Sequence, residues 1–147
     1  MKINKKVLSV LIVLFLIVAI YAFFHIGGKE IRYIHQLSEA ETVSVSIIDG
    51  FSEQQWEIEL NKQQAQSIQK LLKESSYRRR LSSSIEGGLP DKTYHIFANL
   101  DEKGNQHLYI TVYGGEYIQF LNQYGSKYHK ILNPNFEEEL TRIFEVN

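Results

Sequence analysis

The hydrophobic pattern begins with a long apolar segment near the N-terminus. Residues 7–24 are apolar except for Ser9, and three lysines stand among the six residues before them. Eighteen helical residues rise about 27 Å, close to the ~30 Å hydrocarbon core of a bilayer. The apolar character covers every side of such a helix, unlike the stripe of a core helix. We therefore predict a transmembrane helix over 7–26, because a helix satisfies its own backbone groups in lipid.

A cleavable signal peptide is the alternative interpretation of this segment. Signal peptides usually have a shorter apolar region of ~7–15 residues that ends at a small-x-small site. The best candidate site, Ile20-Tyr21-Ala22, begins with a bulky Ile. We favour an uncleaved anchor, and the lysines keep residues 1–6 in the cytoplasm under the positive-inside rule. The C-terminal part is then extracytoplasmic at the cell membrane, with secretion after cleavage as the alternative.

The exported part divides into a linker over 27–41 and one domain over 42–147. Ile31, Ile34 and Leu37 of the linker fit either one side of a short helix or a stalk. Alternating apolar and polar positions in the domain predict strands over 43–47, 56–60, 77–81, 93–100, 106–113, 116–121 and 128–132. Helical spacing predicts helices over 62–74 and from 136 onward, each after a capping-box pattern. The order β-β-α-(β)-β-β-β-β-α predicts an α+β domain with a mainly antiparallel sheet and two amphipathic helices.

Two hairpins set the expected strand registers. A three-residue loop with Gly104 in a left-handed conformation places Ile96 opposite Ile110, so that one face is consistently apolar. A two-residue loop at Gly114-Gly115 then pairs Tyr109 with Phe120, and Thr111 with Ile118.

This register predicts a candidate binding surface. Phe97, Tyr109, Ile118 and Phe120 would share the sheet face opposite Ile96. Two short helices can cover one face, so this aromatic face would be partly open, as is typical of binding sites. The alternative is that the first hairpin or the linker covers it and makes it core.

Composition and charge exclude several classes of function. The 147 residues have a net charge of −1, and after the three N-terminal lysines the balance is 13 Lys/Arg against 17 Asp/Glu. A net charge near −4 argues against nucleic acid as a partner. The absence of Cys excludes disulfides, thiolate catalysis and Cys-ligated metal centres. The His residues also lack metal-ligand spacing, so we expect no metal and no cofactor.

Three further patterns have a plain structural interpretation. Glu57 and Glu59 share a strand face, and with His95 or His107 they are the residues that a hydrolase would use. Ser82-Ser83-Ser84 with Gly87-Gly88 lacks the known nucleophile and phosphate motifs. Arg78-Arg79-Arg80 is the one basic cluster and could meet anionic lipid or wall polymers, although neighbouring side chains of a strand alternate faces.

From about Ser83 to Phe144 the chain resembles a family of small exported or membrane-tethered domains of unknown function from Gram-positive bacteria. The resemblance is carried by Ser83…Pro90…Tyr94-x-Ile96, Leu108-Tyr-Ile-Thr-Val-Tyr113, Tyr117-Ile-Gln-Phe120 and Gly125-Ser-Lys-Tyr-His-Lys-Ile131. The chain departs from the family at Phe120-Leu121-Asn122, where a Pro-Tyr-like turn is expected. The resemblance implies location and architecture and transfers no catalytic residue.

These observations predict a single-pass membrane protein with an extracytoplasmic binding or sensing domain at the cell envelope, and no enzyme activity. Its partners would be the lipid bilayer and an envelope protein, peptide or wall polymer. A structural or assembly component of the envelope is the first alternative, and an envelope hydrolase is the second.

Overall fold

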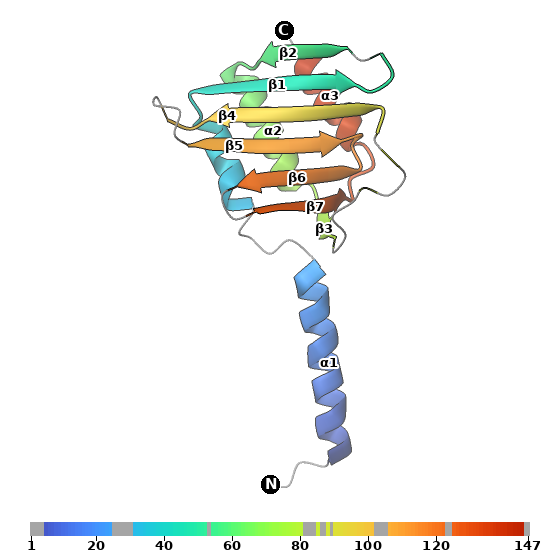
Figure 1. Cartoon of the computed structure of the whole chain (residues 1–147). Helices are drawn as coiled ribbons and strands as arrows, with labels where there is room; N and C mark the ends of the chain where they lie inside the picture. The colour runs from blue at the N-terminus through green and yellow to red at the C-terminus, as the bar shows by residue number, and fades with distance from the viewer. Residues whose placement is uncertain are drawn as a thin grey trace.

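A computed structural model of the chain describes residues 5–24, 31–52, 54–80, 85, 88, 90–101, 106–122 and 125–145 (Figure 1). Its helices are α1 (Lys5–Phe24), the 3-10 helix η1 (Ile31–Ser38), α2 (Lys62–Glu74) and α3 (Phe136–Glu145). Its strands are β1 (Thr42–Asp49), β2 (Gln55–Glu59), β3 (Tyr77–Arg79), β4 (Lys92–Asn99), β5 (His107–Tyr113), β6 (Tyr117–Asn122) and β7 (Gly125–Ile131). They form one antiparallel sheet in the order β2-β1-β4-β5-β6-β7-β3. The α+β prediction is confirmed.

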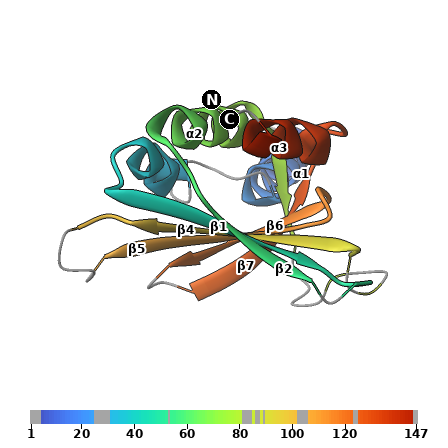
Figure 2. The same cartoon turned by 90° about the horizontal axis from the view of Figure 1, so that it is seen from above.

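The domain has two layers. Figure 2 shows α2, α3 and η1 on the same face of the sheet. The core lies between these helices and the sheet, and its fully buried members include Tyr94, Ile96, Ile110, Ile68, Leu72, Phe136 and Leu140. We call the opposite face of the sheet the outer face. None of the described helices covers it.

Helix α2 follows the sequence prediction closely. The Asn61 side chain accepts a hydrogen bond from the Gln64 backbone N–H (2.9 Å), and the Gln64 side chain accepts one from the Asn61 N–H (3.0 Å). This capping box satisfies two backbone donors that a helix start leaves open. Ala65, Ile68 and Leu72 then face the core.

The predicted register of the central hairpin is confirmed, and that of the next hairpin is wrong. Ile96 lies opposite Ile110 as expected, whereas Ile110 pairs with Phe120 and Val112 with Ile118. The turn with Gly104 itself lies outside the described residues.

The error arises from one extra residue in the second turn. The Glu116 N–H donates to the Tyr113 carbonyl (3.0 Å), and Gly114 and Gly115 have positive φ angles of 54° and 67°. The first strand pair beyond the turn is Tyr113 with Tyr117, so the loop has three residues, not two. Because side chains alternate along a strand, this shift of one residue exchanges the two faces of β6.

The segment predicted as a linker packs on the domain. Ile34 and Leu37 of η1 are fully buried in the core. The Gln69 side-chain amide of α2 donates to the carbonyls of Ile34 (3.0 Å) and His35 (2.6 Å). The domain core therefore begins in η1, before residue 42, because the helix supplies two large apolar side chains.

None of the helices in the described part of the chain is long and apolar enough to cross a membrane. The membrane-spanning helix over 7–26 stays a prediction. Residues 25–26 and 27–30, at the end of the predicted span and the start of the predicted linker, lie outside the described residues.

Candidate functional site

The outer face holds a shallow concavity of about 380 Å³ at the β2 half of the sheet. Strand pairing builds it, because Ser46 lies opposite both Glu57 on β2 and His95 on β4. The concavity is lined by Ser44, Ser46, Ile48, Gln55, Glu57, His95, Phe97 and Tyr109. It therefore combines an apolar ring face with hydroxyl, amide, carboxylate and imidazole groups.

His95 is held in one orientation by hydroxyl groups of the neighbouring strand. Its Nδ1 lies 2.8 Å from the Tyr109 hydroxyl and 3.2 Å from the Thr111 hydroxyl. Partial burial lowers the pKa of His95 below its ordinary value, because burial disfavours the charged imidazolium. The neutral ring carries a single proton, and its Nδ1 shares a hydrogen bond with the Tyr109 hydroxyl.

Aromatic rings form a continuous strip beside His95. The rings of His95 and Tyr109 are 5.7 Å apart at 31°. Phe97 lies 6.5 Å from Tyr109 and 5.3 Å from His107. With 37 % of its surface exposed, Phe97 presents much of its ring to solvent. A large exposed apolar ring beside polar groups is typical of a contact surface.

The first hairpin supplies the polar rim of the concavity. The Gln55 side-chain amide on β2 donates to the Ser46 hydroxyl on β1 (2.9 Å). The Glu57 carboxylate is exposed on the same face. These groups offer both donors and acceptors to a ligand that lies against Phe97.

The other half of the outer face is more closed. The Tyr113 hydroxyl donates to Gln119 Oε1 (2.9 Å), and the rings of Tyr113 and Tyr128 are 5.6 Å apart. Burial raises the pKa of Tyr113, so this hydroxyl stays protonated. Thr111 and Gln119 are buried among these neighbours. This half of the face therefore offers fewer free polar groups.

The structure separates the four residues of the predicted binding surface. Phe97 and Tyr109 lie on the outer face and line the concavity. Ile118 and Phe120 lie on the core face, with 0 % and 4 % of their surface exposed, and Phe120 packs edge-to-face on Tyr77. Their assignment to the surface is wrong, because it rested on the two-residue turn at Gly114-Gly115.

The residues named for a hydrolase are also separated. Glu57 and His95 line the concavity, whereas Glu59 and His107 do not. Within the part of the chain that the structure describes, no group of His, Asp and Glu residues has the arrangement of a metal site. Ser82-Ser83-Ser84 and Gly87 lie outside the described residues.

The contribution of the first hairpin to the site was not predicted from the sequence. Ser44 and Ser46 are the polar positions of the predicted strand 43–47, and Gln55 lies just before the predicted strand 56–60. The signal was available in their parity: Val43, Val45 and Ile47 point to the core, so the residues between them point to the outer face. The position of β1 beside β4, which brings them next to Phe97, depends on long-range pairing.

A larger groove of about 480 Å³ lies between α2 and α3. Its lining mixes polar, charged and apolar side chains, and both of its cations are paired along their own helix. Arg142 Nη2 lies 2.8 Å from Glu138, and Lys70 Nζ lies 3.9 Å from Glu74. The outer-face concavity has the more distinctive combination of groups, despite its smaller volume.

No protein-family model matches the chain, and no curated protein matches it. Among solved structures, the crystal structure of a putative lipoprotein from Clostridium perfringens is similar at 14 % identity and a TM-score of 0.43. The match covers 81 % of this chain and 98 % of that chain.

Proposed function

We propose that the chain is an envelope protein whose N-terminal segment is a membrane anchor and whose folded domain is exported. The proposal rests on the apolar run over 7–24 and the lysines before it. The run extends beyond Tyr21 through Ala22, Phe23 and Phe24. All described side chains from Val7 to Tyr21 are exposed, so no described part of the domain buries them. The hydrocarbon core of a bilayer would surround these apolar side chains and remove them from water.

Cell fractionation and protease shaving test the anchor. We expect the intact chain to stay with membranes in alkaline carbonate. We also expect protease added to intact protoplasts to digest the domain. Recovery of the intact chain from the cytosol would contradict the proposal. Recovery of a shortened chain from the medium would support the secreted alternative.

We propose further that the domain binds a saccharide of the envelope at the outer-face concavity. The observation that carries this proposal is the exposed ring of Phe97 beside an oriented set of polar groups. Sugars present an apolar C–H face and several hydroxyls, so they require both a ring surface and paired donors and acceptors. Phe97 and Tyr109 supply the ring surfaces, and Gln55, Glu57 and Ser46 supply the polar partners.

Binding without catalysis is the function that the geometry favours. A general acid–base pair must lie within hydrogen-bond reach of the same reacting group, directly or through one water. Ser46 lies between Glu57 and His95, so these two residues are separated by two strand spacings, roughly 10 Å. His95 Nδ1 is moreover already engaged by Tyr109. We therefore propose no hydrolytic role for this pair.

Binding isotherms of the full chain in nanodiscs with wall saccharide fragments test the ligand class. We expect Phe97→Ala to weaken binding about tenfold, since truncation of an aromatic anchor costs about 1–2 kcal/mol. Phe51→Ala is the matched control, because Phe51 is 81 % exposed and lies in the β1–β2 turn, outside the lining.

Equal affinities for the wild-type chain and Phe97→Ala would contradict a saccharide site on this face. Binding of envelope peptides in place of saccharides would exclude saccharides as the ligand class. Failure to bind either ligand would favour the structural or assembly role.

A further inference from the structure

The two edges of the sheet carry opposite charge. At one edge, β3 contributes Arg78 and Arg79, Arg80 follows directly, and Lys130 of β7 lies opposite Arg78. At the other edge, β2 has the sequence Gln-Trp-Glu-Ile-Glu and contains no basic residue. We call Arg78, Arg79, Arg80 and Lys130, together with Lys73 in the last turn of α2, the basic edge.

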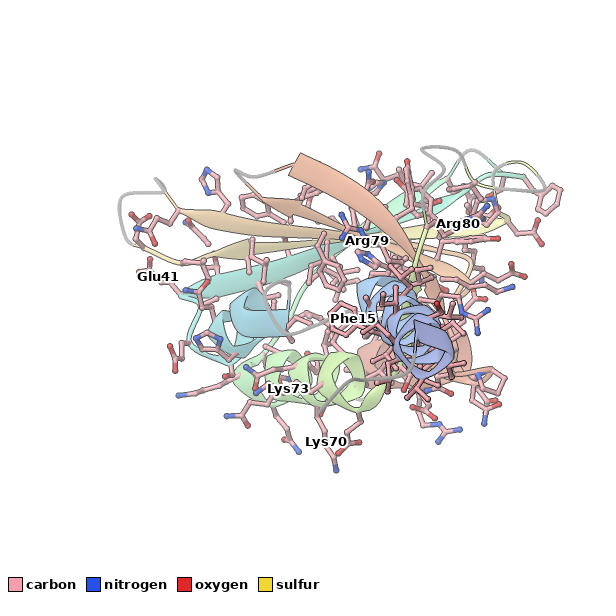
Figure 3. All side chains as sticks on the ribbon, turned by 90° about the horizontal axis from the view of Figure 1, so that it is seen from below. Phe15, Glu41, Lys70, Lys73, Arg79 and Arg80 are labelled. Carbon is pink, nitrogen blue, oxygen red and sulfur yellow. The ribbon has the colours of Figure 1, made fainter. Side chains whose placement is uncertain are left out.

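The basic edge lies on the side of the domain from which α1 projects. Figure 1 shows β3 at the sheet edge nearest α1, and the two elements are in contact. Figure 3 views the molecule from that side and shows Arg79 and Arg80 on one side of α1 and Lys73 on the other. Several cations therefore surround the point where the anchor meets the domain.

The tether between anchor and domain is short. Six residues separate the end of α1 at Phe24 from the start of η1 at Ile31, and an extended chain of that length spans at most about 25 Å. The domain consequently stays next to the surface from which α1 emerges. A tether this short keeps the domain within repeated reach of the headgroups, and its charges respond to them once they come within a Debye length of about 8–10 Å.

Three side chains of the basic edge are exposed to solvent. Lys73, Arg78 and Lys130 are exposed. The guanidinium of Arg80 lies over the Tyr117 ring, with its carbon 5.2 Å from the ring centroid, which holds this cation near β3. The nearest acidic group on α2, Glu74, faces Lys70 at 3.9 Å, and Lys70 is therefore not counted in the basic edge.

We propose that the basic edge docks the domain on anionic phospholipid headgroups of the membrane that holds α1. The proposal rests on the proposed insertion of α1. Headgroup phosphates attract clustered Lys and Arg next to a membrane anchor, and they would repel Glu57 and Glu59 if the opposite edge approached them. The sheet then stands with β3 toward the lipid and β2 away from it. The concavity is built from β1, β2, β4 and β5, so it lies in the half of the sheet that is farther from the membrane.

The absence of Cys allows a single label to report this orientation. The full chain carries a fluorophore at Ser76→Cys, just before β3, or at Gln54→Cys, just before β2; both positions are exposed. Each labelled chain is reconstituted in nanodiscs of phosphatidylcholine alone or of an equal mixture with phosphatidylglycerol. Energy transfer to a headgroup-labelled lipid measures the distance of each edge from the membrane. Retention of the chain by purified nanodiscs measures insertion separately.

In anionic nanodiscs we expect stronger energy transfer from the label at 76 than from the label at 54. This difference should decrease in high salt and in phosphatidylcholine alone. The triple substitution Lys73→Gln/Arg78→Gln/Lys130→Gln should abolish the salt-sensitive part of this difference in energy transfer. The matched control, Lys62→Gln/Lys92→Gln/Arg142→Gln, removes three exposed cations elsewhere and should keep it.

An inserted chain whose two labels transfer energy equally in anionic lipid would overturn the docking proposal and leave the anchor intact. An equal loss in the control variant would overturn it too, because net charge and not the basic edge would be responsible. A chain that nanodiscs do not retain would overturn both the anchor and the docking.

Discussion

The Tyr109 hydroxyl lies 2.8 Å from Nδ1 of His95 on the adjacent strand, and the two rings are 5.7 Å apart. The pair stands at the centre of the outer face, between the polar first hairpin and the more closed half of the sheet. The hydrogen bond between the two side chains orients the Tyr109 hydroxyl and fixes the ring surface next to Phe97. The pair therefore connects the protonation of one side chain to the shape of the proposed binding surface.

The protonation of His95 should contribute to the pH dependence of stability. Burial lowers its pKa in the folded chain relative to the ordinary value of 6.5. The folded state thus favours neutral His95, and its stabilising effect is complete above about pH 6.5 and is lost as the pH falls below that value through the folded pKa. We expect the urea midpoint of the wild-type chain to fall more between about pH 7.5 and pH 5 than that of His95→Asn. An equal decrease of the urea midpoint in the wild-type chain and in His95→Asn would show that other groups account for the pH dependence of stability.

Removal of the Tyr109 hydroxyl should raise the pKa of His95. We assign the Tyr109 O–H as the donor to Nδ1, where it would stabilise the neutral imidazole, since an imidazolium has no lone pair at Nδ1 to accept it. In Tyr109→Phe, an NMR titration of the His95 ring protons should show a pKa closer to 6.5 than in the wild-type chain. Tyr113→Phe is the control, because its hydroxyl bonds Gln119 and not His95. The prediction is wrong if the His95 titration is the same in Tyr109→Phe and in the wild-type chain.

The turn after β5 should be sensitive to a single methyl group. Gly115 has a φ of +67°, and a Cβ there would lie 2.5 Å from Glu137 Cβ at the start of α3. We expect Gly115→Ala to lower the free energy of unfolding by about 1–3 kcal/mol, measured by urea denaturation. Gly88→Ala is a matched control, since Gly88 also has a positive φ, of +93°, but an added Cβ meets no atom within 4 Å. A similar cost at both positions would show that backbone strain alone is responsible, without the clash.

The η1 helix should behave as part of the core. Leu37 is fully buried against α2 and the sheet, so Leu37→Ala should lower the free energy of unfolding of the domain by about 2–5 kcal/mol. The exposed neighbour His35 provides the control, and His35→Ala should change it by less than about 0.5 kcal/mol. Equal, small effects of the two substitutions would restore the linker interpretation of this segment.

The local elements could be predicted from the sequence, and the wrong register of the hairpin after β5 has a physical cause. The capping box at Asn61 and the apolar spacing behind it define α2, because both are signals within one element. The central hairpin was predicted correctly because turn geometry and face parity agree at Ile96 and Ile110. In the next hairpin, the Gly114-Gly115 pair suggested a two-residue turn, and the third turn residue, Glu116, carries no turn signal of its own. The parity of Ile118 and Phe120 was the better guide.

The candidate site was only partly predictable for a related reason. Phe97 and Tyr109 share a hairpin, so their common face follows from local pairing. Ser46, Gln55 and Glu57 reach the same concavity only because β1 pairs with β4 across the sheet, between segments far apart in the sequence. The burial of Ile34 in the core likewise depends on contact with α2. Such long-range contacts leave no short pattern in a single sequence.

Oxidative footprinting of the full chain with and without wall saccharide fragments tests the central claim most directly. We predict that the ligand protects Phe97 and Tyr109 from modification, while the oxidisable side chains of Phe51 and Trp56, both exposed outside the lining, keep the reactivity they have without ligand. Protection of Phe51 or Trp56 with no change at Phe97 and Tyr109 would contradict a binding site on the outer face.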